Sequence, residues 1–237
     1  MIVAVVLGAS GSVGNALIKE LMEGKFQLIL SLVRRSQPDQ IAMAKKRNIE
    51  LREVIVSPME PAALEKATVD AIGSVEGEVV GLSVLGVGAG TAKLTLDEHR
   101  AIDVHLNAAF AKGLKATHRV RHLAFMSAVG SNPNASASGS GAAGSSRYSR
   151  VKGESEEAVK KVGPEVVSIF RPAMIIGSKH TPWILEKTLP LLSFITPAKF
   201  KSITVQQIAK AMVNTSLRPP ANSAVYHFTE MMALGQA

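Results

Sequence analysis

The chain has 237 residues, 46% of them hydrophobic and none of them cysteine, and it carries 27 basic and 19 acidic side chains. This length suits one domain, or one domain with a small appendage, and the apolar fraction excludes global disorder. The lack of cysteine excludes disulfides, thiolate catalysis and thiolate metal sites, and the net charge of +8 favours an anionic ligand.

Short β-branched runs alternate with helical patterns along the chain. Strands are predicted at residues 2–7, 27–33, 49–56, 79–85, 122–126, 166–170 and 224–227. Helices are predicted at residues 12–23, 40–46, 97–115, 147–162 and 205–216, with a short helical turn at 61–66. Apolar strands that alternate with helices indicate an α/β fold with a doubly wound parallel sheet, covered on both faces. We expect residues 1–237 to form a single domain.

The start of the sequence shows no targeting signal, because residues 2–7 open directly as a strand. We therefore expect a cytoplasmic protein. No apolar run approaches the roughly 20 residues that span a bilayer, so no membrane span is expected. The six histidines are scattered singly, so no metal site is expected either.

Residues 8–14 form a glycine-rich motif between the first predicted strand and the first predicted helix. Its spacing is G-x-x-G-x-x-G, with Gly8, Gly11 and Gly14. Side chains at these positions would obstruct the turn, hold a diphosphate away from the backbone and push the helix off the strand, respectively. The N–H groups of the first helical turn then face the diphosphate, and the hydroxyls of Ser10 and Ser12 can add donors. In this context the motif predicts dinucleotide binding.

The end of the second predicted strand indicates which dinucleotide. In NAD-binding proteins this strand usually ends in a carboxylate residue that binds the ribose hydroxyls. Here the strand runs into Arg34 and Arg35, so no carboxylate repels a 2′-phosphate and two guanidiniums can bind one. Solvated surface arginines are the alternative interpretation, but the upstream glycine motif favours NADP over NAD.

Tyr148 and Lys152 are the candidate catalytic pair. They lie four residues apart on a predicted helix and therefore project from the same face. A free tyrosine has a pKa of about 10, and a neighbouring ammonium lowers it toward the range useful for proton transfer. Lys152 can also hold the ribose of a nicotinamide. The Y-x-x-x-K spacing alone is common by chance, and its place after the glycine motif makes it specific.

Five segments together resemble the short-chain dehydrogenase/reductase superfamily in its atypical branch: GASGSVG, LVRRS, YSRVKGE, FRPAMIIG and ITVQQIAKAMV. Across essentially the whole chain they are similar to the Tat-interacting-protein-like oxidoreductases of that branch. The resemblance implies a Rossmann-like fold that binds NADP. It assigns Ser10, Gly11, Ser12 and Val13 to the phosphates, Arg34 and Arg35 to the 2′-phosphate, Leu85 and Gly86 to the adenosine side, Tyr148 to acid/base chemistry and Lys152 to the ribose. It also places Pro172 where the family's backbone passes the nicotinamide carboxamide.

A third catalytic residue is expected at the end of the fifth strand, where the family has Ser or Thr. Ser127 is our candidate. If the working hydroxyl belongs one position later, Ala128 has replaced it, and Ser131 is a more distant substitute. Asn107 could match an asparagine that some members of the superfamily use in a proton relay, although it could equally be a surface residue.

Two further segments have less specific patterns. Residues 178–201 are apolar and broken by prolines, which predicts a small C-terminal substrate cap or a helix packed on the core or a second subunit. Residues 112–122 are rich in basic side chains. With 4% aromatic residues and no recognised nucleic-acid module, a solvated surface is favoured there over nucleic-acid binding.

The expected function is an NADPH-dependent oxidoreductase that transfers hydride to a small carbonyl or enone, with Tyr148 as acid/base. The alternative is a non-catalytic NADPH-binding regulatory or assembly protein. The expected partners are a small-molecule substrate or a protein, and the chain is expected to be a monomer or a homodimer.

Overall fold

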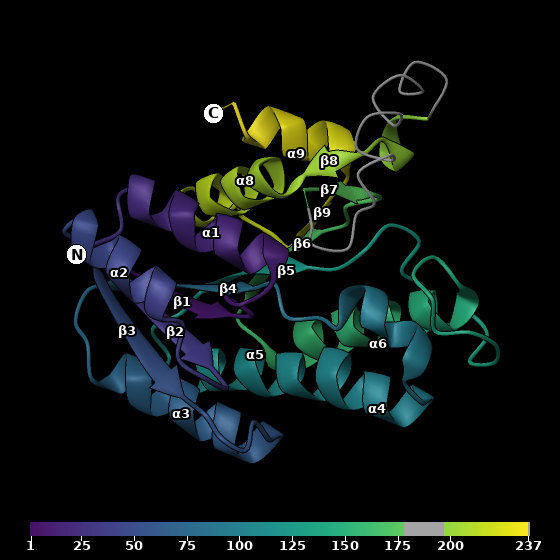
Figure 1. Cartoon of the computed structure of the whole chain (residues 1–237), viewed down its shortest axis with the longest axis horizontal. Helices are drawn as coiled ribbons and strands as arrows, with labels where there is room; N and C mark the ends of the chain where they lie inside the picture. Colours follow the sequence, from purple (N-terminus) through teal and green to yellow (C-terminus); the bar gives the residue numbers. More distant parts are fainter. Residues whose placement is uncertain (178–196, 237) are drawn as a thin grey trace.

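The computed structural model describes residues 1–177 and 197–236. Within these ranges a seven-stranded sheet has the order β3-β2-β1-β4-β5-β6-β9, and all neighbouring strands are parallel (Figure 1). The strands are β1 (Ile2–Leu7), β2 (Leu28–Val33), β3 (Glu50–Ile55), β4 (Glu78–Ser83), β5 (His122–Met126), β6 (Val166–Phe170) and β9 (Ala224–Tyr226). A separate parallel pair is formed by β7 (Ile175–Ile176) and β8 (Ile203–Thr204). The predicted α/β fold with a parallel sheet is therefore confirmed.

Helices cover both faces of the sheet. The α-helices are α1 (Ser12–Glu23), α2 (Pro38–Lys46), α3 (Pro61–Gly73), α4 (Leu96–Arg100), α5 (Asn107–Ala116), α6 (Ser146–Val162), α8 (Val205–Leu217) and α9 (Phe228–Leu234). In Figure 1, α1, α8 and α9 lie above the sheet, and α3, α5 and α6 lie below it. Short 3₁₀ segments are η1 (Gly88–Lys93) and η4 (Ala198–Phe200), and η2 (Ala101–Leu106) is π-helical.

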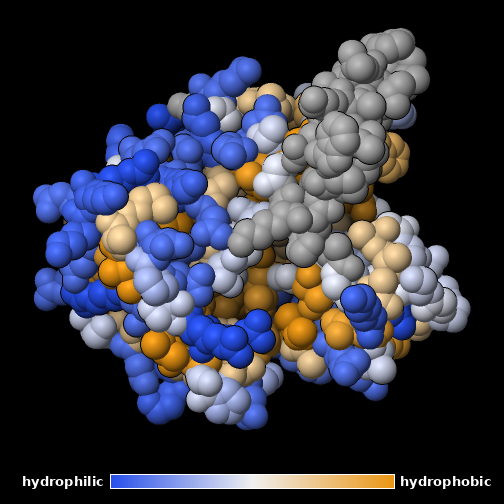
Figure 2. Space-filling view, viewed as in Figure 1, coloured by the Kyte–Doolittle hydropathy of each residue, from blue (hydrophilic) through white to orange (hydrophobic). Residues whose placement is uncertain are grey.

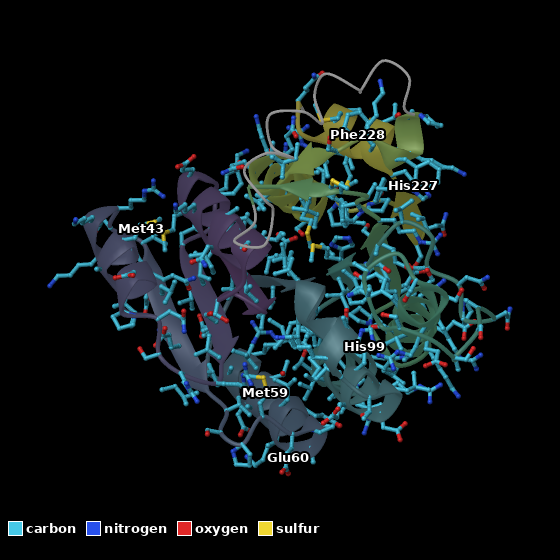
Figure 3. The ribbon with its side chains drawn as sticks, turned by 45° about the vertical axis from the view of Figure 1, so that its right-hand side comes forward. Met43, Met59, Glu60, His99, His227 and Phe228 are labelled. Carbon is cyan, nitrogen blue, oxygen red and sulfur yellow. The ribbon has the colours of Figure 1, made fainter. Side chains whose placement is uncertain are left out.

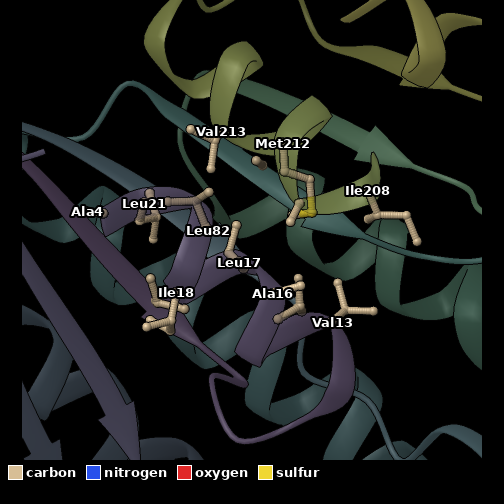
Figure 4. Packing of buried hydrophobic residues seen from close by; sticks show 14 of the residues in the cluster. Ala4, Val13, Ala16, Leu17, Ile18, Leu21, Leu82, Ile208, Met212 and Val213 are labelled. Atoms are coloured by element: carbon tan, nitrogen blue, oxygen red, sulfur yellow. The ribbon is translucent and has the colours of Figure 1, made fainter. Parts of the chain in front are cut away.

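The core consists of two apolar layers separated by the sheet. Alternate residues of β1 point to opposite faces, so Ala4 and Val6 pack in the layer of α1 and α8 while Val5 and Leu7 pack in the layer of α3 and α5. Figure 4 shows the first layer, in which side chains of α1 face Met212 and its neighbours on α8. Because both faces of β1 are buried, its sequence is continuously apolar.

The layer of α3 and α5 contains a close approach of two helices. A Cβ added to Gly113 of α5 would lie 2.8 Å from the Thr68 Cβ and 2.9 Å from the Glu65 carbonyl oxygen. Only a residue without a side chain fits between these backbones. The crossing positions α5 under β1 and β4, at the side of the sheet where the residues discussed below lie.

Two predicted elements differ from the structure. The short turn predicted at residues 61–66 is a helix of 13 residues, α3, because Leu64, Thr68 and Ile72 bury one continuous face. The single helix predicted at residues 97–115 is divided into α4, the π-helix η2 and α5. No proline or glycine lies between Asp97 and Lys112, so the sequence contains no signal of this change.

The predicted cap at residues 178–201 falls mostly on residues 178–196, which lie outside the described residues. Its last part is described and contains η4. Across the described ranges, no helix has the length and apolarity needed to cross a membrane.

β1 lies at the topological switch point of the sheet, where the strand order reverses. β2 and β3 lie on one side of β1, and β4, β5, β6 and β9 lie on the other. In open parallel sheets, the crevice at such a point, beyond the carboxyl ends of the strands, is the usual ligand site. The motifs singled out in the sequence follow the carboxyl ends of these strands.

Candidate functional site

The glycine turn after β1 is closed on two sides by backbone. Gly8 has φ +92°, and a Cβ there would lie 2.6 Å from the Leu85 amide nitrogen after β4. A Cβ on Gly14 would lie 2.1 Å from the Gly8 carbonyl oxygen, so α1 packs directly on the turn. Both predicted reasons for glycine, a tight turn and close packing of helix on strand, therefore apply.

Gly11 differs from the other two glycines of the motif. A Cβ there would meet only the Gly8 carbonyl oxygen, at 3.5 Å, so the position faces open space rather than protein. Ser12 and Val13 follow it as the first residues of α1. The N-terminal end of a helix attracts anions through its dipole and its unpaired N–H groups. The structure thus leaves open space beside Gly11, the position where the sequence analysis expects a diphosphate.

Two amide side chains hold the turn in shape. The Asn15 side chain donates to the carbonyl oxygens of Ser10 and Gly11, at 3.3 and 3.0 Å. Gln40 of α2, itself buried, donates to the Ala9 carbonyl oxygen at 2.9 Å and to the Asn15 amide oxygen at 2.8 Å. The turn is therefore fixed without any ligand. The sequence analysis did not identify Asn15 or Gln40.

A polar pocket of about 470 Å³ lies beside this turn, at the carboxyl ends of β1, β2 and β3. It is lined by Ser10, Arg34, Arg35, Gln37, Ser57, Pro58 and Met59. Figure 3 marks Met59 on this side of the molecule. Both predicted arginines line the pocket, together with one serine of the glycine motif. The sequence analysis did not predict that Gln37 and Met59 would join them.

Glu53 of β3 holds the loop that carries the arginines. Its carboxylate accepts hydrogen bonds from the Ser36 hydroxyl at 2.5 Å and from the Gln37 backbone N–H at 2.6 Å. These bonds occupy both carboxylate oxygens and tie the loop after β2 to the neighbouring strand. The negative charge of Glu53 is thus directed at the Ser36 hydroxyl and the Gln37 backbone N–H.

The predicted catalytic pair comes together on α6. The Lys152 ammonium nitrogen lies 5.9 Å from the centre of the Tyr148 ring, and the Lys152 side chain is almost fully buried. That ammonium forms an ion pair with the Asp103 carboxylate, with 2.7 Å between Nζ and Oδ1. The Tyr148 ring also stacks on His99 of α4, with ring centres 5.8 Å apart. Figure 3 labels His99 between α4 and α6.

The charges at this place perturb one another. Burial alone would raise the pKa of Asp103, but Lys152 and His99 outweigh it and lower that pKa to about 2. Burial would lower the pKa of Lys152, but Asp103 and Tyr148 hold it above the ordinary lysine value. Burial raises the pKa of Tyr148, and Asp103 adds to that rise while Lys152 opposes it. Tyr148 is therefore protonated at neutral pH.

Ser127, the predicted third catalytic residue, lies in a different hydrogen-bond network. Its hydroxyl donates to the buried Glu156 carboxylate at 2.5 Å and lies 2.9 Å from the Ser131 hydroxyl. Glu156 also forms a bidentate ion pair with Arg171, at 2.6 and 2.8 Å. In the described part of the chain no hydrogen bond joins Ser127 to Tyr148. The structure thus brings Ser127 and the substitute Ser131 together, but ties both to other groups.

Asn107 is buried and fully used in the structure. Its amide oxygen accepts from the Ser83 hydroxyl at 2.5 Å, and its amide nitrogen donates to the carbonyl oxygens of Leu85 and Asp103. It therefore fastens the end of β4 to η2, which explains its position without a relay. Gly86 comes next after Leu85 in the chain and lies beside the Lys152 ammonium.

Pro172 follows β6 and is buried. Its carbonyl oxygen accepts from the Val129 N–H at 2.9 Å, which joins the chain after β6 to the chain after β5. This places Pro172 at the same edge of the sheet as Ser127.

The basic cluster at residues 112–122 is largely engaged in contacts within the protein. Arg119 donates to the carbonyl oxygens of Ile72, Val75 and Gly77, in and after the last turn of α3, and Arg121 pairs with Glu165. Lys112 pairs with Glu65. In Figure 2, hydrophilic residues predominate at the left of the view, over α1 and α2. Within the described ranges, no group of three histidine or acidic side chains is arranged to hold a metal ion.

Asp103 and His99 are the functional candidates that the sequence analysis missed next to Tyr148. A signal was present, since His99, Asp103 and Asn107 recur every four residues and form one polar stripe on an apolar helical face. The stripe is buried against α6 and the end of β4 rather than exposed to solvent.

Comparisons with known proteins agree with this geometry. The profile of an NAD(P)H-binding family matches residues 8–219. The chain is similar to the protein FMP52, mitochondrial, of Eremothecium gossypii, with 27% identity over 182 residues, which are 75% of this chain and 68% of that protein. That name concerns the relative, and the cytoplasmic location expected for this chain stays a prediction.

Solved structures of low sequence identity share the fold. A short-chain dehydrogenase/reductase from Serratia marcescens has a TM-score of 0.65 and 16% identity, with 97% of each chain covered. MoeE5 in complex with UDP-glucuronic acid and NAD has a TM-score of 0.67 and 16% identity, over 95% of this chain and 75% of that one. The fold is thus the Rossmann-like fold of dehydrogenases and epimerases. Because the profile begins at the glycine turn and extends over most of the sequence, the chain belongs to the NAD(P)H-binding family.

Proposed function

We propose that this protein is an NADPH-dependent oxidoreductase that reduces a small carbonyl compound or enone. The observation that carries the proposal is the pairing of half-buried Tyr148 with buried Lys152 at the carboxyl edge of a dinucleotide-binding sheet. The resemblance of its sequence to the atypical short-chain dehydrogenase/reductases, and to the Tat-interacting-protein-like branch among them, supports the same function.

The residues present fit the cofactor. The open space beside Gly11 accepts a diphosphate, and Arg34 and Arg35 can bind a 2′-phosphate in the adjoining pocket. The arginines favour NADP over NAD because a 2′-phosphate adds a dianion that only the phosphorylated cofactor has. When bound, NADPH would supply a hydride from its nicotinamide ring. Lys152 would hold the nicotinamide ribose, and Pro172 would lie near the carboxamide.

Tyr148 would act as the proton donor. Its pKa is raised by burial and by Asp103, so the phenol keeps its proton at neutral pH and can give it to a developing alkoxide. A raised pKa suits the direction of reduction, because the phenolate needed for oxidation forms only in alkaline solution. Ser127 would complete the site only if its hydroxyl left Glu156 for the substrate.

Substitution of Tyr148 tests the proposal. In assays of NADPH consumption against a panel of aldehydes, ketones and enones, we expect Tyr148→Phe to lower kcat at least about 100-fold, the usual loss of a general acid. NADPH affinity should stay within about twofold, because the phenyl ring still stacks on His99. Tyr226→Phe removes the other tyrosine and serves as the control. Turnover by Tyr148→Phe at the wild-type rate would show that the proton comes from elsewhere.

A second candidate is a non-catalytic NADPH-binding regulatory or assembly protein. It is favoured by one observation, the engagement of the Ser127 hydroxyl with Glu156 and Ser131. This function predicts NADPH-dependent capture of a defined protein partner with no turnover of any carbonyl in the panel. Partner binding would then be lost together with NADPH affinity in Arg34→Glu/Arg35→Glu. A cytoplasmic location, and a monomeric or dimeric state, remain part of the proposal for either function.

A further inference from the structure

We propose that Asp103 is a positioning residue that fixes the Lys152 ammonium at Tyr148 and joins it to the loop after β4. Its role toward a bound nicotinamide ribose rests on the proposed function, whereas its hold on Lys152 does not. Nothing in the comparisons assigns a role to this residue.

The first argument is the geometry of the pair. One carboxylate oxygen of Asp103 lies 2.7 Å from the Lys152 ammonium, and the other accepts the Val87 backbone N–H at 3.1 Å. The side chains of Asp103 and Lys152 are 0% and 5% exposed. A buried ammonium needs a buried partner, because neither charge can be stabilised by water. Asp103 is that partner, and it binds the lysine and the loop at the same time.

Gly86 shows that the surrounding chain is adapted to this pair. A Cβ on Gly86 would lie 3.0 Å from the Lys152 ammonium nitrogen and 3.2 Å from the Asp103 carboxylate. The backbone after β4 therefore passes close to the ion pair, and a side chain at Gly86 would force the Lys152 ammonium or the Asp103 carboxylate to shift. The pair lies at the edge of the sheet where the predicted adenosine-side residues Leu85 and Gly86 meet α6.

The helical geometry around Asp103 is unusual. Asp103 lies in the π-helix η2, between the short helix α4 and the helix α5. π-helical turns are rare and are found frequently at functional sites. The Asp103 carbonyl oxygen accepts from the side chains of Asn107 and Ser155, so backbone and side chain of this residue are both held. The irregular turn is thus held by side chains of α5 and α6.

The charged and titratable groups that face the pair come from two elements. From α4, the His99 Nε2 atom lies 3.8 Å from the second Asp103 oxygen. From α6, Tyr148 and Lys152 face it directly, and Glu156 acts on Lys152 from farther away. Asp103 is the nearest carboxylate to the ammonium. Its removal would leave the buried Lys152 ammonium without its nearest carboxylate.

The first test measures Lys152 itself and needs no cofactor. The chain is labelled with ¹³C at lysine Cε, the Lys152 signal is assigned with Lys152→Arg, and its chemical shift is followed with pH. In Asp103→Asn the oxygen that faces Val87 is kept and the charge is lost. We expect the pKa of Lys152 to lie below the ordinary lysine value of 10.5 in this variant and above it in the wild type. A Lys152 that titrates above 10.5 in Asp103→Asn would overturn the proposal.

A control and a rescue guard this test against loss of folding. Asp97→Asn, on the same stretch of helix but 94% exposed, should leave the Lys152 titration unchanged. If Asp103→Asn fails to fold, Asp103→Asn/Lys152→Met removes both charges and should recover the folded protein. A double variant no more stable than the single variant would mean that Asp103 does not act through Lys152.

The second test concerns the cofactor. By calorimetry, we expect Asp103→Asn to bind NADPH about tenfold more weakly and adenosine 2′,5′-bisphosphate, which lacks the nicotinamide ribose, as tightly as wild type. Equal weakening of both ligands would indicate general damage and overturn the positioning role. If the wild type binds no NADPH, the proposed function fails, and the lysine titration still decides the role of Asp103.

Discussion

Individual residues divide the candidate site into two regions of opposite character. Around Arg34 and Arg35 the side chains are exposed and wet, and their position depends on the bonds that Glu53 makes to the same loop. At the second region Lys152 and Asp103 are buried, Tyr148 is half-buried, and each is held by its neighbours. Solvent screens the charges of the arginine loop, so a change of charge there alters ligand affinity but leaves the local structure intact. At Tyr148 and Lys152 little solvent is present, so each charge needs a particular partner.

Removal of both arginines should change the choice of cofactor. We expect Arg34→Ala/Arg35→Ala to lower NADPH affinity at least about tenfold and to leave NADH affinity within about twofold, since only NADPH has the 2′-phosphate. Isothermal calorimetry with both cofactors measures this. Arg52→Ala, which removes an exposed arginine paired with Glu50 on β3, is the control. Equal losses for the two cofactors would show that the arginines do not read the 2′-phosphate.

The sequence predicted residues whose roles depend on local spacing. Gly8, Gly11 and Gly14 occupy one turn, and Tyr148 and Lys152 occupy one helical face, so their patterns can be read from neighbouring positions. Glu53 and Gln40 could not be found in this way, and the four-residue spacing of His99, Asp103 and Asn107 marks a polar stripe without showing that Asp103 pairs with Lys152. Each acts on a segment from another part of the chain, and only the folded sheet brings the two together.

At the scale of elements, the contact between α3 and α5 is determined by a single glycine. Gly113 allows the two backbones to approach, and this contact positions α5 beneath the sheet. Because α5 continues from η2 without a break, its position also determines where Asp103 lies relative to α6. The contact between α3 and α5 at Gly113 therefore helps to hold Asp103 in its position beside α6.

An alanine at Gly113 should therefore destabilise the protein. We expect Gly113→Ala to lower the free energy of unfolding by about 1–3 kcal/mol, although alanine has the higher helix propensity, because the methyl group meets Thr68 and the Glu65 backbone. Chemical denaturation measures the change. Gly73→Ala, at the last residue of α3 with open space around it, is the matched control and should be neutral or slightly stabilising. A Gly113→Ala variant as stable as Gly73→Ala would contradict the close approach.

Elements with a strong local pattern were predicted with their observed bounds. This holds for β1, α1, β5 and β6, where an apolar run or an amphipathic helix ends at a glycine or a polar residue. The division of residues 97–115 into three segments could not be predicted. Nothing in their composition disfavours a regular helix, and the π-helical turn coincides with contacts to α6 and β4 that the local sequence does not encode.

For the whole molecule, buried ionisable groups make stability depend on pH. His122 of β5 is buried with its Nε2 atom 2.9 Å from the Ser168 hydroxyl, and burial lowers its pKa from 6.5 to about 4. In the unfolded chain it binds a proton near its ordinary pKa. The unfolded state therefore binds more protons between pH 6.5 and 4, and acid in this window favours unfolding.

Replacement of His122 should remove part of this acid sensitivity. We expect the wild type to lose about 2 kcal/mol of unfolding free energy through this group between pH 8 and pH 5, and His122→Gln to lack that loss. Urea unfolding at both pH values measures the difference. His105→Gln, at an exposed position in η2, is the control and should keep the wild-type dependence. The same loss in His122→Gln as in the wild type would refute the assignment.

The central place of β1 has a consequence for the order in which the site is completed during synthesis. All residues that line the pocket beside the glycine turn lie within the first 59 residues. The turn nevertheless rests on Val84 and Leu85, and β1 lacks one of its two neighbours until β4 has formed. A nascent chain that has exposed only these 59 residues therefore presents the side chains proposed to bind the cofactor without the support that fixes them. Recognition of the dinucleotide has to wait for β4 to leave the ribosome, although nearly every group on its adenosine side was made earlier.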